Sequence, residues 1–103
     1  MNKYHNVPTT LDNHTFPSKR EAARYLELKL LLIAKHIHSL RLQPAYPIVV
    51  NNLHVATYYA DFTYVDAATG ATVIEDAKGV RTSVYALKKK LVEALYQVQI
   101  VEV

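Results

Sequence analysis

The sequence predicts a single α/β or α+β domain, in which a mixed sheet is flanked by helices. Two stretches, residues 18–35 and 83–96, carry apolar side chains at helical spacing. Between these stretches and after the second one, apolar and polar residues nearly alternate, as is typical of strands. A chain of 103 residues suits one compact domain.

The composition excludes several classes of protein. Cysteine is absent, which excludes disulfide frameworks and thiolate metal sites. The two glycines are too few for the glycine-rich nucleotide-binding motifs. No long uncharged apolar run is present, so no membrane association is expected, and the start "MNKYHNVPTT" lacks the apolar stretch of a signal peptide. We therefore expect a cytoplasmic protein, and its net charge of +3 favours an anionic partner.

The amino-terminal part is expected to be an irregular arm over residues 1–16, followed by a single domain over residues 17–103. Ser18 and Glu21 have the spacing of a capping box at the start of the first helix. Glu21 is then either the partner of that cap only, or, because it shares a flank with apolar residues, it turns toward the sheet. The apolar stripe expected to face the core comprises Ala22, Tyr25, Leu26, Lys29, Leu30 and Ile33.

The predicted strands follow this helix. The first is "IHSLRLQP", ended by Pro44, and the second runs from "AYPIVV" through a turn-like Asn51 and Asn52 to "LHVATYYADFTYVD". A hairpin loop over residues 67–70, with Gly70 in the left-handed position, leads to the return strand "ATVIEDAKG".

A second helix, "SVYALKKKLVEALY", and a closing strand, "VQIVEV", complete the chain. The element order is therefore helix, strand, strand, strand, helix, strand. The side chains expected to face inward from the second helix are Val84, Leu87, Leu91 and Leu95.

Charged residues inside the return strand raise the question of function. With a four-residue loop, the hairpin register places Asp61 opposite Asp76, and strand alternation puts Lys78 on the same face as Asp76. Two facing carboxylates are destabilising unless something compensates, and Mg²⁺ is the simplest compensation because it prefers hard oxygen ligands. Glu75 points to the opposite face and is expected to be structural.

Two other interpretations stay open at this level. The charges form a solvated face in which Asp61 pairs with Lys78, or a loop one residue longer or shorter brings Glu75 or Ala77 opposite Asp61. A histidine metal site is not expected, because none of the five histidines forms a pair at helical i, i+4 spacing.

The succession "SKREAARY" on a helix, "LRLQP", "YYADFTYVD" and "VIEDAKG", followed by a helix, resembles the PD-(D/E)XK nuclease superfamily. It is similar in particular to small uncharacterised phage and prophage proteins that begin in the "KYHN" style, over nearly the whole chain. The resemblance implies a restriction-endonuclease-like core. The sequence departs from the pattern in having "YAD" in place of Pro-Asp, and an Asp as its second acid.

The resemblance also implies a set of site residues. Asp61 matches the first carboxylate, Asp76 the second and Lys78 the catalytic lysine, while Glu21 matches the helical acid near the metal. Mg²⁺ or Mn²⁺ would be held by Asp61, Asp76 and the backbone carbonyl of Ala77, with Glu21 reaching the ion directly or through water.

Contacts with DNA are implied for four further residues. Gln43 matches a glutamine that follows the first strand in related nucleases, and Arg81, Lys88 and Lys3 are candidates for phosphate contacts. The implied function is that of a metal-dependent DNA endonuclease of phage or prophage origin, acting in the bacterial host cytoplasm. Branched recombination intermediates such as Holliday junctions are one candidate substrate, and a homodimer is left open. The alternatives are a non-catalytic DNA-binding module that keeps the nuclease fold, and a structural or interaction protein.

Overall fold

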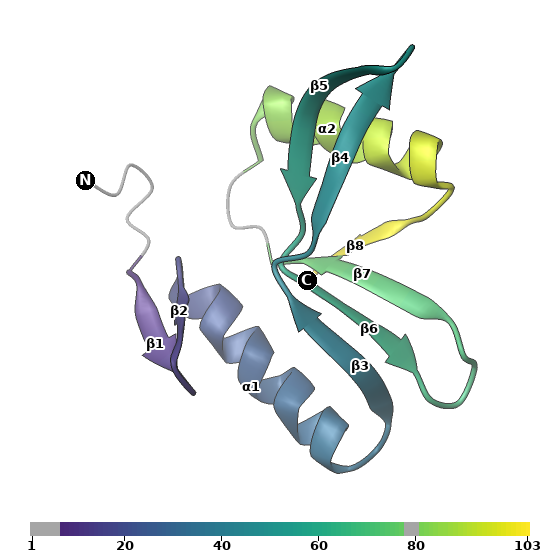
Figure 1. Cartoon of the computed structure of the whole chain (residues 1–103). Helices are drawn as coiled ribbons and strands as arrows, with labels where there is room; N and C mark the ends of the chain where they lie inside the picture. Colours follow the sequence, from purple (N-terminus) through teal and green to yellow (C-terminus); the bar gives the residue numbers. More distant parts are fainter. Residues whose placement is uncertain (1–6, 78–80) are drawn as a thin grey trace.

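The structure is a computed structural model that describes residues 7–77 and 81–103 (Figure 1). In these residues the helices are α1 (Lys19–Ile33) and α2 (Ser83–Tyr96). The strands, in chain order, are β1 (Thr9–Leu11), β2 (His14–Phe16), β3 (Ile37–Leu42), β4 (Ala45–Val50), β5 (Leu53–Tyr59), β6 (Phe62–Asp66), β7 (Thr72–Asp76) and β8 (Ile100–Glu102). The two predicted helices and the mixed α+β character are confirmed.

The main sheet has four strands in the order β3-β6-β7-β8. The pairs β3–β6 and β6–β7 are antiparallel, whereas β7 and β8 are parallel. Parallel neighbours need a crossover connection, and α2 provides it between β7 and β8. The predicted mixed sheet of four strands with two helices is therefore confirmed.

The predicted order of elements is wrong between the two helices, where the described residues form five strands instead of three. Strands β4 and β5 form a separate two-stranded sheet that projects beside α2 (Figure 1). The chain leaves this hairpin at Ala60 and Asp61 and then enters β6. Because the alternation of "LHVATYYADFTYVD" continues through this point without Gly or Pro, the sequence carries no local sign of the break.

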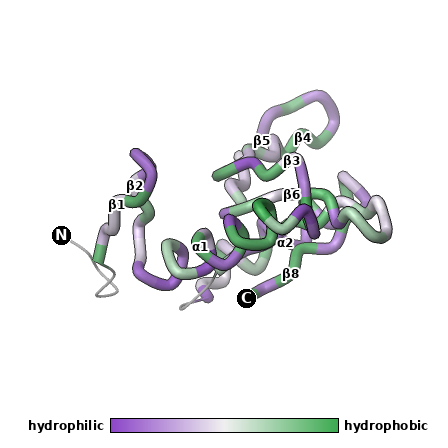
Figure 2. Tube along the Cα trace, turned by 90° about the horizontal axis from the view of Figure 1, so that it is seen from below, coloured by the Kyte–Doolittle hydropathy of each residue, from purple (hydrophilic) through white to green (hydrophobic). Residues whose placement is uncertain are grey.

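The amino-terminal arm is also more regular than expected, because β1 and β2 form an antiparallel hairpin. Asp12 and Asn13 join the two strands with positive φ angles of 50° and 64°, which is the geometry of a type I′ turn. Asn51 and Asn52 repeat this geometry between β4 and β5, with φ angles of 50° and 65°, so the turn predicted there is confirmed. Both turns consist of hydrophilic residues (Figure 2).

The β6–β7 hairpin has the predicted loop. The N–H of Asp66 donates to the carbonyl of Ala71 at 2.9 Å, and the N–H of Gly70 donates to the carbonyl of Asp66 at 2.8 Å. Gly70 has a φ of 74°, as its place in the loop requires. The same register continues along the hairpin to the pair formed by Phe62 and Glu75.

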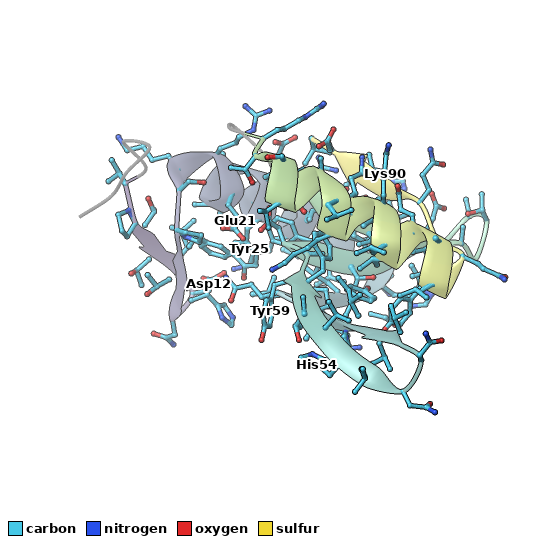
Figure 3. The ribbon with its side chains drawn as sticks, turned by 90° about the horizontal axis from the view of Figure 1, so that it is seen from above. Asp12, Glu21, Tyr25, His54, Tyr59 and Lys90 are labelled. Carbon is cyan, nitrogen blue, oxygen red and sulfur yellow. The ribbon has the colours of Figure 1, made fainter. Side chains whose placement is uncertain are left out.

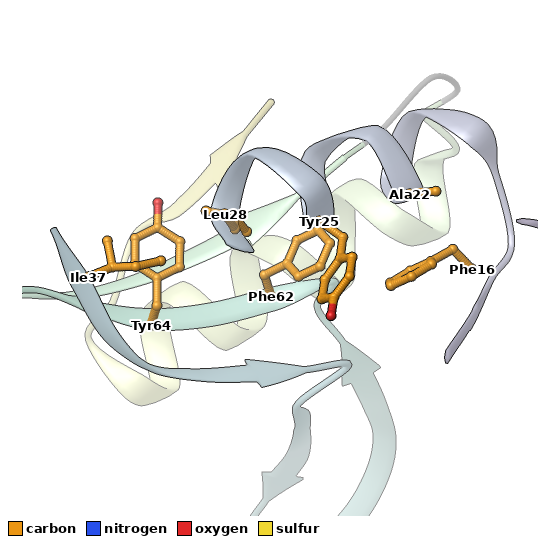
Figure 4. Packing of buried hydrophobic residues seen from close by; sticks show 7 residues of the cluster. All are labelled: Phe16, Ala22, Tyr25, Leu28, Ile37, Phe62 and Tyr64. Atoms are coloured by element: carbon orange, nitrogen blue, oxygen red, sulfur yellow. The ribbon is translucent and has the colours of Figure 1, made fainter. Parts of the chain in front are cut away.

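Helix α1 begins as predicted but presents a different face to the core. Ser18 caps it, because its hydroxyl accepts the N–H of Glu21 at 3.2 Å. The predicted stripe is partly wrong, since Leu26, Leu30 and Ile33 are exposed. The buried face instead contains Glu21, Ala22, Tyr25 and Leu28. Three of these residues join the first core cluster (Figure 4), whose buried members are Phe16, Ala22, Tyr25, Leu28, Ile37, Phe62 and Tyr64.

Helix α2 has the predicted bounds, but its predicted inward face is largely wrong. Val92 is its buried residue, whereas Val84, Leu87 and Leu95 are exposed. The second core cluster lies between α2, the β4–β5 hairpin and the main sheet, and its buried members are Ile48, Tyr58, Ala60, Ile74, Val92 and Ile100. In the described ranges, neither helix is both long and apolar enough to cross a membrane.

Candidate active site

The end of β5, the start of β6 and the end of β7 lie together near the middle of the molecule (Figure 1). The predicted acids converge there: Glu21 comes from α1, Asp61 from the link between β5 and β6, and Asp76 from the end of β7. Glu21 is 2% exposed and Asp76 is fully buried. Buried acidic side chains are rare unless other groups compensate for them, so this cluster is the first place to look for function.

Asp61 reaches Asp76 by a route different from the one predicted. The regular register ends where Phe62 pairs with Glu75, and the N–H of Asp61 donates to the carbonyl of that same Glu75 at 3.0 Å. Two residues of one strand thus oppose one residue of the other, as in a β-bulge, and a bulge re-aims the side chain it carries. Oδ2 of Asp61 accepts the N–H of Ala77 at 2.6 Å, and the Asp61 side chain is also hydrogen-bonded to that of Asp76.

Glu21 completes this group of acids. Its side chain turns from α1 toward the sheet, where it is hydrogen-bonded to the carboxyl group of Asp61. This contact decides between the two interpretations of Glu21, because its main-chain N–H is capped by Ser18 while its side chain is buried at the site. Three acidic residues from three different parts of the chain are thus linked through Asp61.

The surroundings of Asp61 favour its protonated form. Burial is the main cause, and together with the nearby Glu21 it raises the pKa of Asp61 to about 6, although the hydrogen bonds from Ala77 and Asp76 act in the opposite direction. Neighbouring carboxyl groups at a buried site cannot all be ionised without a positive charge beside them. The site therefore needs either bound protons or a cation.

The family to which the chain belongs is shown by comparison with known sequences. A family described as a protein of unknown function, DUF1064, matches residues 1–102. The chain belongs to the DUF1064 family. No curated protein and no solved structure matches it. The resemblance of this DUF1064 chain to the PD-(D/E)XK nucleases therefore stays a prediction.

Two tyrosines, Tyr58 and Tyr85, lie near Asp76 in this DUF1064 chain, and the sequence did not point to them. The hydroxyl of Tyr58 donates to Oδ2 of Asp76, and burial and this hydrogen bond raise the pKa of Tyr58. Tyr58 also shares a hydrogen bond with Tyr85, whose hydroxyl donates to Glu102 at 2.9 Å. Tyr58 and Asp76 are 18 residues apart, so no spacing rule connects them.

Glu75 lies outside the acid cluster, as the alternation of the strand predicted. Nε of Arg24 donates to its Oε1 at 2.8 Å, and Nη2 donates to its Oε2 at 2.7 Å. The hydroxyl of Tyr64 donates to Oε2 as well. A carboxylate held by a bidentate guanidinium and a hydroxyl has a structural role.

The residues predicted to supply positive charge or to contact DNA do not gather around the site as closely as the acids do. Lys78 and Lys3 lie outside the described residues. Gln43 has an exposed side chain, and its N–H donates to the carbonyl of Asp61 at 2.8 Å. Arg81 is exposed and pairs with Glu102, whereas Lys88 is half-buried, with Nζ 3.4 Å from the carbonyl of Thr57.

The donor chemistry of the cluster fits a hard divalent cation. Across residues 7–77 and 81–103, no three His, Cys, Asp or Glu side chains are grouped so that they could hold a metal ion. Mg²⁺, however, often takes only one or two carboxylates and keeps several waters. Asp61 and Asp76 would supply those carboxylates, with the carbonyl of Ala77 as a further oxygen. The contact of Glu21 with Asp61 makes it the residue that orients the first acid.

Proposed function

We propose that this DUF1064 chain is a Mg²⁺- or Mn²⁺-dependent DNA endonuclease that hydrolyses phosphodiester bonds at a site of the PD-(D/E)XK kind. The observation that carries the proposal is the hydrogen bond between the side chains of Asp61 and Asp76, where Asp76 is fully buried at the end of β7 and Asp61 is partly buried just before β6. An arrangement of this kind disfavours folding by itself, because burying adjacent carboxyl groups has an energetic cost. A divalent cation between them would offset that cost and would give the cluster a use.

A bound Mg²⁺ or Mn²⁺ would lower the pKa of a water ligand and offset negative charge on the scissile phosphate. In this proposal Asp61 and Asp76 hold the ion, the N–H of Ala77 fixes Asp61, and Tyr58 fixes Asp76. The oxygen of water bonds to phosphorus, the bond from phosphorus to the leaving sugar oxygen breaks, and that oxygen takes up a proton. Lys78 is proposed to orient the attacking water or to stabilise charge on the phosphate in the transition state.

The proposed substrate is DNA of a phage or its bacterial host, in the cytoplasm. Gln43 supports this part of the proposal, because its main chain is bonded to that of Asp61 and its side chain is exposed beside the site. A chain this small offers little surface for reading a base sequence, so a structural feature such as a branch is the proposed target.

Cleavage of a panel of linear, nicked, flapped and four-way-junction DNAs, with Mn²⁺ and with EDTA, tests the proposal. We expect Mn²⁺-dependent cleavage by the wild type and none by Asp61→Asn. Glu27→Gln is the matched control, because Glu27 lies on α1 with its side chain 64% exposed. Binding of DNA without any cleavage would instead support the non-catalytic DNA-binding module.

A further inference from the structure

A pocket of about 250 Å³ lies between the end of β5 and the start of α2. The residues that line it include Tyr58, Tyr59 and Tyr85, together with Lys88 and Thr82. We propose that this pocket binds one nucleotide of the substrate DNA, with its phosphate at Lys88 and its base against the tyrosine rings. The inference rests on the proposed function, since it names the part of the substrate that lies beside the candidate active site.

The aromatic lining fits a nucleobase. Tyr59 is a large ring that is 63% exposed, and it stands at the very end of β5. Tyr58 and Tyr85 also line the pocket, and their rings pack against each other with centroids 6.3 Å apart, so both rings are held in place. Bases stack on such rings with little regard to sequence, which suits an enzyme that recognises DNA structure.

The charge in the pocket fits a phosphate. Lys88 is half-buried, and within the described ranges no ion pair joins it to an acidic side chain. The neighbouring Lys89 differs, because its Nζ lies 3.8 Å from Oε1 of Glu102. In those ranges, Nζ of Lys88 makes only the long 3.4 Å hydrogen bond to the carbonyl of Thr57. A lysine that forms no ion pair with the described acidic side chains and lies beside aromatic residues is suited to attract a phosphodiester backbone.

Tyr58 connects the pocket to the acid cluster. This residue lines the pocket, and its hydroxyl donates to Asp76. The next two residues after Tyr59 are Ala60 and Asp61, so the outer wall of the pocket continues directly into the cluster. A strand whose scissile phosphate lies at Asp61 and Asp76 would therefore place a neighbouring nucleotide at the pocket.

Equilibrium binding of a fluorescent six-nucleotide single-stranded DNA, measured in EDTA so that no cleavage occurs, tests the proposal. The charge-matched pair is Lys88→Gln and Lys90→Gln. Figure 3 shows Lys90 on the outer side of the same helix, away from Tyr59. The ring is tested by Tyr59→Ala against Leu53→Ala, which removes another exposed apolar side chain from β5. The same oligonucleotide without bases, carrying only abasic sugars, separates contacts to bases from contacts to phosphates.

We expect Lys88→Gln to raise the Kd by about tenfold, and Lys90→Gln by less than about twofold. Tyr59→Ala should raise the Kd by at least about fivefold with the normal oligonucleotide and leave it unchanged with the abasic one, because stacking needs a base. Equal losses for the two lysine variants, no effect of Tyr59→Ala, or no binding by the wild type would each overturn the pocket.

The proposed function fails independently of this pocket. If the wild type binds DNA, Lys88→Gln and Tyr59→Ala weaken that binding, and no DNA is cleaved, only the nuclease assignment is contradicted. Metal-dependent cleavage that is unchanged in both Lys88→Gln and Tyr59→Ala would contradict only the pocket.

Discussion

Oδ2 of Asp61 accepts a 2.6 Å hydrogen bond from the N–H of Ala77, the residue that directly follows Asp76. The first acid is therefore attached to the backbone of the strand that supplies the second. A bulge at the start of β6 makes this contact possible, because it frees Asp61 from the regular ladder. The geometry of the candidate site thus depends on main-chain atoms as much as on the acids themselves.

The stability of the metal-free protein should fall as the pH rises. Asp61 has a pKa of about 6 in the folded chain, above the ordinary value of 3.8. Between these two pH values the folded state binds more protons than the unfolded state, so the free energy of unfolding decreases with increasing pH by at most about 3 kcal/mol. Urea unfolding in EDTA at pH 4, 5, 6 and 8 measures this slope.

Asp61→Asn is the matched variant for that measurement, because an amide cannot ionise. It should lose this part of the pH dependence and be more stable than the wild type at pH 8. A variant less stable than the wild type at pH 8 would mean that the Asp61 carboxylate stabilises the fold, contrary to the structure.

Metal binding should release a proton from Asp61. At pH 5.5 this carboxyl is largely protonated, since its pKa is about 6, and a ligand carboxylate has to be ionised. Calorimetric titration with Mn²⁺ in two buffers of different ionisation enthalpy should therefore give different observed enthalpies at pH 5.5 and similar ones at pH 8. If the two buffers gave the same observed enthalpy at pH 5.5 as well as at pH 8, no proton would be released and the metal would bind elsewhere. Glu27→Gln is the control and should behave as the wild type.

Tyr58→Phe should weaken metal binding while the protein stays folded. The hydroxyl of Tyr58 orients Asp76, and the loss of such a supporting contact costs about 10- to 100-fold in metal affinity. Tyr46→Phe is the control. Tyr46 packs against the same cluster, with its ring centroid 6.4 Å from that of Tyr58, and it makes no described contact with the acids. Equal affinities for the two variants, measured by the same titration at pH 8, would show that Tyr58 has only a packing role.

Glu75→Gln should destabilise the fold and leave metal binding intact. Glu75 is 1% exposed, and the change would remove the nearer and buried carboxylate partner of Arg24, leaving only the exposed Glu27 at 3.4 Å among the described acidic residues. We expect a loss of about 2 to 4 kcal/mol in the free energy of unfolding. If denaturant unfolding showed no loss and Mn²⁺ affinity fell instead, Glu75 and not Asp76 would belong to the site.

The sequence predicted correctly those parts of the fold that depend on residues close together in the chain. The loop with Gly70 and the bounds of α2 were predicted correctly, because a turn and a capped helix depend on adjacent residues. The β1–β2 hairpin was missed, although Asp12 and Asn13 between strand-like residues are a typical type I′ signal. The faces of α1 could not be deduced, because its leucines lie on most sides of the helix and the buried position of Glu21 depends on Asp61.

The sequence predicted the acidic residues of the candidate site, but not the contacts that hold these residues in place. Hairpin register brought Asp61 near Asp76, yet the bulge that joins them depends on where β5 leaves the sheet. Tyr58 reaches Asp76 only because the β4–β5 hairpin folds back beside α2. Similarly, Arg24 and Glu75 are 51 residues apart and meet through the packing of α1 on the sheet.

The most direct test of the central claim is the single-turnover rate of DNA cleavage by the wild type and by Asp76→Asn, in Mn²⁺ and with the most readily cut DNA of the panel. The acid cluster predicts a rate that depends on Mn²⁺ and falls at least about a hundredfold in Asp76→Asn, with Glu27→Gln unchanged. A folded Asp76→Asn protein that cleaves as fast as the wild type would contradict the claim that these acids form a nuclease site.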